Sequence, residues 1–580
     1  MAKGYRPVNR DQLMLLPADM REWLPAGHAV HVVIEAVVHH LDTSAFHAGR
    51  KTGGPGAAGY DPDMLVAVLA WAYAHQVTSS RRIEQLCRTD VAFRLICGGN
   101  FPDHVTIHDF RAAFPDAAAR FFAEVLVLCA RLGMGKLGVV ALDGMKIAAS
   151  ASMSANRTED RLAKLAAETV ARHGQDDAAE DALFGPGTAG DEIPAWSPRD
   201  RASRVAAAAA SLRADREAAE AEAARQAADY LKAAEAGQAG AGRVPDAARV
   251  RAAELRVARA EAAQAAKIEA WEQQRQAEEQ AGTRRKGPGG RKPPSPPGEH
   301  FTVRRARQAL DRARAAEAAR RDAPAPEPGP APVRNLTDPD SRLMPVRGGG
   351  FIQGYNAQNL TSQDGLIIGT ALTQDPADTT WLAPMLDRLA HAAALITAHR
   401  TAAGHRAPQP ASGDPGPGYQ PPPPDDSPAP PPSPVGLLLA DAGYCSEHNI
   451  SAPGPPRLIA VAKHRDLEKA AASPEPPAGP RPRASTVIAD MRARLQTEAG
   501  ITAYRQRSHQ AETPHGHIKH NMNYRQLPVR GKTKATADWT FTTATHNLFK
   551  AITTGHLTLT ALSQLRDRST YPLATPYQPA

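Results

Sequence analysis

The sequence changes character most sharply at Lys136, where the segment KLGVVALDGMKIAAS begins. From about residue 11 to 132, apolar residues recur at spacings of three and four, which is typical of helices that bury one face. KLGVVALDGMKIAAS instead contains β-branched and small apolar residues bounded by glycine, as buried strands do. This change predicts an all-α N-terminal domain followed by a domain built on a sheet, with Asp143 in or just past the first strand.

Further strands are expected well downstream. They are predicted at Gly354–Leu360, at Leu366–Leu372, in VGLLLADAGY, which carries Asp441 near its end, and in RLIAVAK at Arg457–Lys463. A helix is predicted from about Thr380 to Ala398, and Ile501–Leu562 is expected to be mainly helical. Strands interspersed with helices place this part of the chain in the α/β class.

A long insertion separates the first predicted strand from the others. Residues 202–280 are rich in Ala, Glu, Arg and Gln and are strongly helix-prone, but their apolar face is nearly all alanine and can bury little area. We predict a long helical hairpin broken near Gly237–Pro245, followed by the flexible basic linker GTRRKGPGGRKPPSPPG. The expected domains are 1–132 (helical), 133–155 with 343–560 (a sheet-based core with a proline-rich loop, 407–434), 156–342 (helical insertion and linker) and 561–580 (tail).

The charge balance and the cysteine spacing limit which partners and metal sites this chain can have. The 580 residues contain 69 Lys and Arg against 61 Asp and Glu, a net charge of +8 that has the sign expected for a DNA partner but is weak evidence alone. The four cysteines are scattered without the paired spacing of structural zinc, as in a protein with reduced thiols. Without a signal sequence or a membrane-spanning run, we expect a cytoplasmic, nucleoid-associated protein that does not contact the membrane.

Two aspartates close apolar strands and could share a metal ion. Asp143 is followed by Gly144, and Asp441 stands in LLLAD before AGY. Carboxylates at neighbouring strand ends can converge on Mg²⁺ or Mn²⁺, which prefer oxygen ligands and keep positions open for phosphates. For either aspartate alone, a turn or helix N-cap role is the simpler interpretation. Asp375 and Asp378 precede a predicted helix, and we interpret both as capping residues rather than ligands.

A third acid lies in a cluster of cationic and hydrogen-bonding groups. In AYRQRSHQAETPHGHIKHNMNYRQLPVRG, Glu512 stands among tyrosine, arginine, histidine and lysine residues. Because Pro514 follows closely, we predict a helix that starts near Thr513, with Glu512 at or near its N-cap. The Arg-dense TSSRRIEQLCRTDVAFR, with Arg81 and Arg82, could contact DNA, although a solvated helix face is nearly as good an interpretation.

Several linked segments resemble the DDE transposases of bacterial insertion sequences. VALDGMKIAASAS resembles their first-aspartate strand, NLTDPDSRLM with GGFIQGYNAQ their middle section, and LLLADAGYCS their second-aspartate strand. The last block, with YRQR, AETPHGHIK and RQLPVRG, resembles their Tyr-Arg-Glu-Lys signature. The N-terminal YDPDMLVAVLAWAYAHQVTSSRRIEQLCRTDVAFR with PDHVTIHDFR resembles the helical domain that precedes the core in this group. The sequence departs from the pattern at Thr513 and His515, where the family often has proline and an aromatic residue, and Arg507 to Glu512 is one residue longer than in the most familiar form of the signature.

The resemblance implies a specific chemistry. It implies an RNase H-like fold, a mixed sheet flanked by helices, in which Asp143, Asp441 and Glu512 are the catalytic acids and bind Mg²⁺ or Mn²⁺. Tyr504, Arg507 and Lys519 fall on the accompanying signature positions, where they would contact DNA. The expected reaction is two-metal hydrolysis and transesterification of DNA, with double-stranded terminal repeats and target DNA as partners and a homodimer in the synaptic complex.

Two other functions are compatible with parts of the sequence. A decayed or repurposed transposase would bind DNA through its helical domain without catalysis, although the intact acids argue against it. A metal-dependent nuclease unrelated to mobility would account for the carboxylates but not for the helical N-terminal block or the basic cluster around Glu512.

Overall fold

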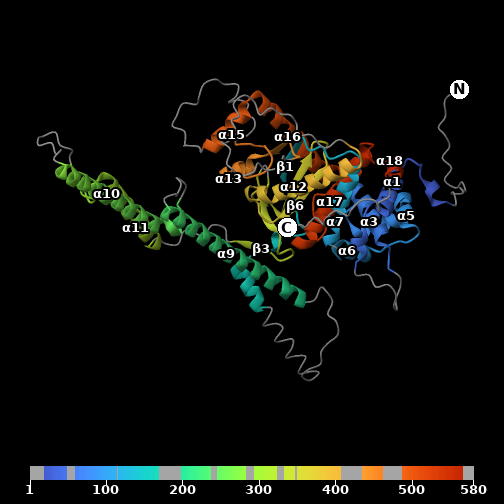
Figure 1. Ribbon diagram of the computed structural model, residues 1–580. Helices are drawn as coiled ribbons and strands as arrows, with labels where there is room; N and C mark the ends of the chain where they lie inside the picture. Colours follow the sequence, from blue (N-terminus) through green and yellow to red (C-terminus); the bar gives the residue numbers. More distant parts are fainter. Residues whose placement is uncertain are drawn as a thin grey trace, which may run out of the picture. The chain divides into compact units, whose positions relative to one another are not determined.

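A computed structural model describes most of the chain, in two compact units (Figure 1). Unit 1 contains residues 1–156 and 335–580, and unit 2 contains residues 157–334. The described residues are 19–48, 59–113, 115–168, 198–236, 244–281, 293–322, 332–346, 349–405, 434–461 and 486–565. Most of the proline-rich loop and of the basic linker, and most of the tail, lie outside these ranges.

A mixed sheet forms the centre of unit 1, with strand order β4-β5-β1-β7-β8 and with β6 also paired to β5. The strand β1 is antiparallel to β5 and parallel to β7, and β7 is parallel to β8. The strand bounds are Val139–Ala148 for β1, Arg342–Pro345 for β4, Phe351–Ser362 for β5, Ile367–Thr373 for β6, Leu437–Ala440 for β7 and Arg457–Ile459 for β8. Five of these six strands, all except β4, form where the apolar runs predicted them, and the mixed sheet and the all-helical N-terminal region agree with the predicted fold class.

Side-chain alternation along β1 and β7 gives the sheet two different faces. Val139 and Leu439 lie in a small core with Met491, Leu495 and Tyr504, which come from α15 (Thr486–Gln496) and α16 (Glu498–Gly516). Val140, Leu142 and Leu438 point to the other face and join the large core of the unit. Asp143 and Asp441 lie toward the face that α16 covers, since both contact Arg507 on that helix.

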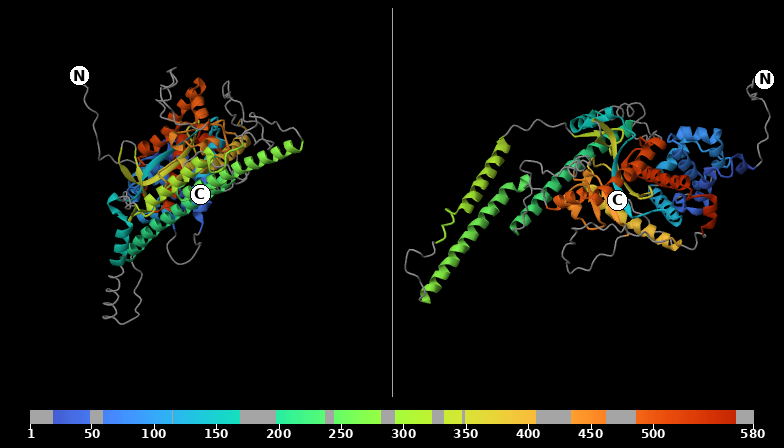
Figure 2. Two further views of the ribbon diagram at one scale, coloured as in Figure 1. Left: turned by 90° about the vertical axis from the view of Figure 1, so that its left-hand side faces the viewer. Right: turned by 90° about the horizontal axis from the view of Figure 1, so that it is seen from above.

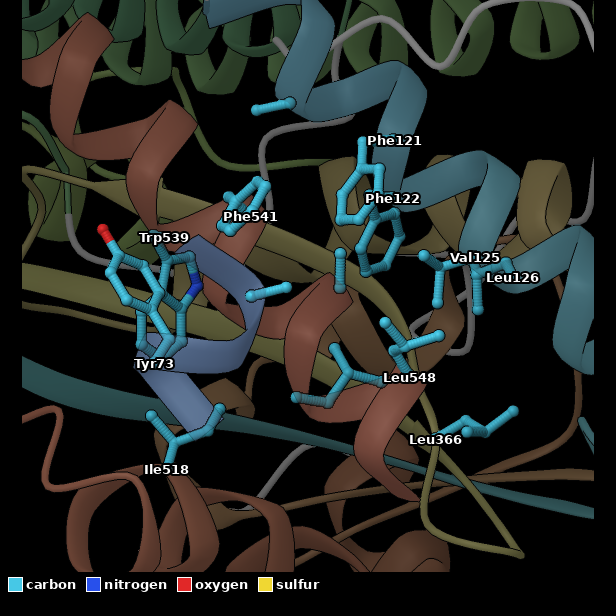
Figure 3. Close-up of a cluster of buried hydrophobic side chains, with 14 of the residues drawn as sticks. Tyr73, Phe121, Phe122, Val125, Leu126, Leu366, Ile518, Trp539, Phe541 and Leu548 are labelled. Atoms are coloured by element: carbon cyan, nitrogen blue, oxygen red, sulfur yellow. The ribbon is translucent and has the colours of Figure 1, made fainter. Parts of the chain in front are cut away.

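The N-terminal helices share the large core with the C-terminal helix α17 (Lys532–Thr553). Figure 3 shows Phe121 and Phe122 on one helix facing Phe541. The rings of Phe121 and Phe541 are stacked with centroids 5.1 Å apart. These aromatic side chains come from helices before and after the strands in the sequence, and they join these helices in a single hydrophobic interior. The helices that precede the sheet are α1 (Ala29–Glu35), α2 (Ser44–His47), α3 (Pro62–Ala74), α4 (Ser80–Thr89), α5 (Val91–Cys97), α6 (His104–Ala113) and α7 (Pro115–Arg131).

A buried ionic cluster ties α6 and α17 together. The Nε atom of Arg111 lies 3.6 Å from Asp538 Oδ1, and both side chains are almost fully buried. Tyr73 and Tyr524 each donate a hydroxyl hydrogen bond to the Asp538 carboxylate. Because an unpaired charge is costly in such an interior, these partners explain how Asp538 is accommodated there.

Unit 2 is built from long helices: α9 (Pro198–Glu235), α10 (Arg249–Gln280) and α11 (Phe301–Asp322). The chain breaks between α9 and α10 where the sequence predicted it, and α11 is an additional helix that pairs with α10 (Figure 2). Ion pairs Arg307–Glu261 (2.6 Å) and Arg314–Glu254 (3.0 Å) join α10 and α11, and their order shows that the two helices run antiparallel. The side chains buried in α9 and α10 are mostly alanines, as the composition predicted.

Among the described residues, no helix combines the length and apolar character that a bilayer crossing requires.

Candidate functional site

Asp143 and Asp441 lie side by side at the end of two parallel strands. The register of β1 and β7 pairs Leu142 with Ala440, so the residue that follows each of these two is one of the aspartates. Asp143 is still within β1, whereas Asp441 has left β7 and begins the short turn η6 (Ala442–Tyr444). The sequence pattern of an aspartate closing each apolar run thus brings both carboxylates to one edge of the sheet.

Arg507 on α16 contacts both aspartates. Its Nη2 atom lies 2.8 Å from Asp143 Oδ1 and 3.6 Å from Asp441 Oδ2. The side chains of Arg507 and Asp143 are each 14% exposed, so their charges interact with little screening by solvent. On the same helix, His515 Nδ1 lies 3.6 Å from Asp143 Oδ2.

The surroundings lower the pKa of the Asp143 carboxyl group and raise the pKa of the Asp441 carboxyl group. Burial opposes ionisation of Asp143, but the hydrogen bond and charge of His515, together with the charge of Arg507, outweigh burial and lower its pKa. Burial raises the pKa of Asp441, and the neighbouring charges of Asp143 and Asp378 raise it further against the effect of Arg507. The site therefore holds more negative charge than Arg507 alone can balance, which favours an additional cation.

Glu512 lies inside α16 rather than at a helix start. The helix begins at Glu498, capped by the side chain of Thr497, and continues through Pro514 to Gly516. The predicted N-cap position of Glu512 is therefore wrong. Proline normally interrupts a helix because it lacks an N–H, but here Gln510, Ala511, Pro514 and His515 are all buried, and this packing keeps the helix continuous.

Glu512 is exposed and shares α16 with Arg507. Its charge contributes to the raised pKa of Arg507, which burial alone would lower. The structure thus places Asp143 and Asp441 in one cluster and links Glu512 to that cluster through its charge interaction with Arg507.

The other predicted site residues lie in different surroundings. Tyr504 is buried, and its hydroxyl donates to the carbonyl oxygen of Ala440 at 3.1 Å, so it supports the strand end that precedes Asp441. Lys519 lies in η7 (His517–Asn521), where burial lowers its pKa while the charge of Asp143 raises it. Arg81 and Arg82 are exposed on α4, a helix that carries none of the three acids.

A further acid, Asp378, lies beside the two aspartates and was misread from sequence. It occupies the N-cap position of η5 (Thr379–Trp381), but its side chain makes no capping hydrogen bond. Its Oδ1 atom instead accepts hydrogen bonds of 2.7 Å from Asn356 Nδ2 and from Gln358 Nε2. The capping interpretation is therefore wrong for Asp378, whereas Asp375 does accept the backbone N–H of Ala377 at 2.9 Å.

The sequence contained one signal for this arrangement. Asn356 and Gln358 alternate on β5 and are both fully buried, and buried amides must find hydrogen-bond partners. The register places Gln358 opposite Gly144, next to the first aspartate. Only the strand pairing, which is not encoded locally, reveals that these amides face Asp378.

The donor set at this edge of the sheet fits a hard divalent cation. All the candidate ligands are carboxylate oxygens, and Mg²⁺ and Mn²⁺ favour such ligands over nitrogen or sulfur. Gly144 and Gly443 keep the space next to the carboxylates open, since a Cβ on Gly443 would lie 3.0 Å from both Asp441 Oδ1 and Asp378 Oδ2.

Among the described residues, His47, Asp61 and Asp63 form the one group of three potential ligands whose ligand atoms all lie within 4.8 Å of one another. His47 Nε2 and Asp63 Oδ1 are 2.8 Å apart, and Asp61 caps α3 by accepting the N–H of Asp63. The first two residues are exposed and the group is occupied with local contacts, so it does not compete with the sheet-edge cluster.

Two family models match parts of the chain. The transposase domain (DUF772) matches residues 18–113, and the transposase DDE domain matches residues 480–552. The first segment contains α1 to α6, and the second contains Tyr504, Arg507, Glu512 and Lys519 but neither Asp143 nor Asp441. No curated protein and no solved structure matches the chain in the other two comparisons.

Proposed function

We propose that the chain is an insertion-sequence DDE-type transposase, which the two family matches support, and that it cuts and rejoins DNA at the ends of an insertion sequence through Asp143, Asp441 and Glu512. The observation that carries this proposal is that Arg507 contacts both Asp143 and Asp441. Arg507 lies on α16, which is within the segment that matches the transposase DDE domain. A helical N-terminal block that only binds DNA would not require two carboxylates to meet at a sheet edge.

An RNase H-like core is part of the proposal. The first aspartate lies on a strand that is antiparallel to one neighbour and parallel to the other, and the second aspartate follows the parallel neighbour. Helices cover both faces of this mixed sheet, which supports the fold that the resemblance implies.

DDE transposases generally use divalent metal ions, and Asp143, Asp441 and Glu512 are the residues that would hold Mg²⁺ or Mn²⁺ here. When bound between carboxylates, such ions lower the pKa of a coordinated water and stabilise the departing oxygen of a phosphodiester. Glu512 is exposed on α16, so its carboxylate is accessible from solvent, and its charge acts on Arg507, which contacts both aspartates.

The basic residues around the acids have separate roles in the proposal. Arg507 balances the charge of Asp143 and Asp441 until a cation or a phosphate replaces that contact. Lys519, whose pKa is lowered by burial, lies near enough to Asp143 to interact with it and would hold a phosphate next to the acids. Tyr504 acts structurally, because its hydroxyl is committed to Ala440.

Double-stranded DNA is the proposed partner, both as element ends and as target. The exposed Arg81 and Arg82 on α4, within the matched transposase domain, would contact the phosphate backbone. A homodimer in the synaptic complex follows from the need to hold two ends at once.

The experiment is Mg²⁺- or Mn²⁺-dependent nicking of a duplex that carries the flanking ends of the protein's own gene. We expect cleavage by the wild type and none by Glu512→Gln or Asp143→Asn, with DNA binding retained in a mobility-shift assay. Glu498→Gln is the matched control, because Glu498 is exposed on the same helix but lies at its opposite end. Cleavage by Asp143→Asn would remove Asp143 from the site, and binding without cleavage by the wild type would favour a DNA-binding protein that has lost catalysis.

A further inference from the structure

Asp378 reaches the acid cluster from a segment that no sequence motif assigned to it. Its Oδ1 atom lies next to Gly144, where an added Cβ would be only 2.5 Å away, and its Oδ2 atom lies next to Gly443. Gly144 follows Asp143 directly, and Gly443 lies two residues after Asp441. The carboxylate of Asp378 therefore occupies the space that both glycines leave open beside the two aspartates.

Hydrogen bonds from the described residues hold one oxygen of this carboxylate, Oδ1, but not the other. Oδ1 accepts hydrogen bonds from Asn356 and Gln358, and Lys146 Nζ lies 3.5 Å away. Gln358 is itself oriented, because its Oε1 atom accepts a hydrogen bond from the buried hydroxyl of Tyr444. By contrast, the described residues supply no hydrogen bond or ion pair to Oδ2, which faces the Asp441 side of the turn.

The chain holds the turns around Asp378 and Asp441 together. Thr379 Oγ1 donates to the carbonyl oxygen of Gly443 at 2.8 Å, and Asn449 Nδ2 donates to the carbonyl oxygens of both Thr379 and Tyr444. Asp378 and Asp441 are thus kept next to each other by several hydrogen bonds, although two carboxylates repel. Such an arrangement is typical of positions where a cation is expected to offset the repulsion.

We propose that Asp378 is a positioning residue of the metal site: held by Asn356 and Gln358, it directs Oδ2 at the Asp441 side and increases the affinity for the cation there. This inference rests on the proposed function, since it assumes that Asp143 and Asp441 bind a divalent ion. It also explains why Asn356 and Gln358, in the YNAQ segment of β5, both donate to Oδ1 of Asp378, since this leaves Oδ2 available for the cation side. Outer carboxylates of this kind tune affinity by changing the charge around the ligands.

The test compares Mn²⁺ binding by the full chain, measured by calorimetry, for the wild type, Asp378→Asn, Asp375→Asn and Asp143→Asn. Asparagine retains an oxygen that can accept from Asn356 and Gln358, so the substitution removes charge with little change of shape. We expect Asp378→Asn to bind Mn²⁺ about 10- to 100-fold more weakly. Asp375→Asn, three residues away in the same segment, should bind as the wild type does.

A second readout separates positioning from a merely structural role. Without metal, the thermal unfolding midpoint of Asp378→Asn should be equal to or above that of Asp375→Asn, because one of two repelling charges is gone. With Mn²⁺, its upward shift should be smaller than that of the wild type. A metal-free midpoint clearly below the control would indicate a structural role and overturn the inference.

The remaining outcomes distinguish this inference from the proposed function. If Asp378→Asn binds Mn²⁺ as tightly as the wild type while Asp143→Asn does not, Asp378 has no role in the site but the proposed function stands. If Asp143→Asn also binds like the wild type, the proposed metal site itself is wrong and the inference fails with it.

Discussion

Replacing Arg507 with glutamine should make the stability of unit 1 depend on divalent metal. In the structure, Arg507 lies 2.8 Å from Asp143 and 3.6 Å from Asp441, and it is the residue that contacts both acids among the described ion pairs. Glutamine can donate one hydrogen bond but carries no charge. The substitution would therefore leave two adjacent carboxylates compensated by His515 and by the charge of Lys519, but no longer by a group that contacts both.

The magnitude follows from the burial of the pair. Removing one partner of a buried ion pair typically costs about 3–5 kcal/mol, because the remaining charge is desolvated and unpaired. We expect the lower end, about 3 kcal/mol, since His515 still lies 3.6 Å from Asp143 and the Asp441 side chain is 34% exposed. Mn²⁺ at about 100 times its dissociation constant would return about 2.7 kcal/mol.

Urea denaturation in EDTA and in excess Mn²⁺ measures both effects. The free energy of unfolding of Arg507→Gln should fall in EDTA and should rise more on addition of Mn²⁺ than that of the wild type, because Arg507 no longer opposes the cation. Arg505→Gln, which removes an exposed arginine two residues earlier on α16, is the matched control. Equal Mn²⁺ shifts in both variants, or no loss in EDTA relative to Arg505→Gln, would refute the reasoning.

Further predictions concern the core, the pH dependence and the DNA contact. Arg111→Met should lower the free energy of unfolding by about 3–5 kcal/mol, since it leaves the Asp538 charge buried; a loss below about 1 kcal/mol would contradict this. Burial and His517 lower the pKa of His546 to about 3 from an ordinary 6.5, so below pH 6.5 the unfolded chain binds a proton that the folded chain excludes. Stability should thus decrease by up to about 1.4 kcal/mol per pH unit toward pH 3, and His546→Gln should remove that part of the slope in denaturation curves. Arg81→Ala with Arg82→Ala should weaken binding to element ends and reduce the salt slope by about 2 in mobility-shift titrations, and an unchanged slope would place the phosphate contacts elsewhere.

The strands and the two aspartates could be predicted because their signals are local. A buried strand shows a short apolar run, and Asp143 and Asp441 each stand where such a run ends. Parallel neighbours bring those ends to the same edge, so the sequence also indicates that the acids meet. Unit 2 lies between β1 and β7 in the sequence, and yet the two strands pair. Their apolar runs could be recognised without any knowledge of how this insertion folds.

The start of α16 could not be predicted because local and tertiary effects oppose each other there. Proline at position 514 favours a helix start just before it, and on local rules Glu512 becomes an N-cap. In the structure, Tyr504, Gln510, Ala511 and Pro514 are buried, and α16 contacts β1, β5 and β7. The free energy gained by covering the sheet exceeds the cost of one missing backbone hydrogen bond.

The role of Asp378 was missed for a related reason. An aspartate before a helix is usually a cap, and this interpretation uses only neighbouring residues. The partners of Asp378 are 20 and 22 residues away on β5, and they reach it through the antiparallel register that places Gln358 opposite Gly144. Buried amides on a central strand were the one indication that an unpaired acceptor had to lie nearby.

The buried contact between Arg111 and Asp538 has a consequence for how DNA recognition and chemistry are coupled. Arg111 lies in the segment that matches the DUF772 transposase domain, and Asp538 lies in the segment that matches the transposase DDE domain. With Phe121 stacked on Phe541, the helices that would contact DNA share one hydrophobic interior with α17, which packs on the sheet that carries the acids. Deleting the N-terminal block would expose this interior and unfold the site, so loss of end binding after such a deletion says little about recognition. Substitution of exposed side chains such as Arg81 and Arg82 leaves the shared core intact. It is therefore the change that can separate end binding from catalysis.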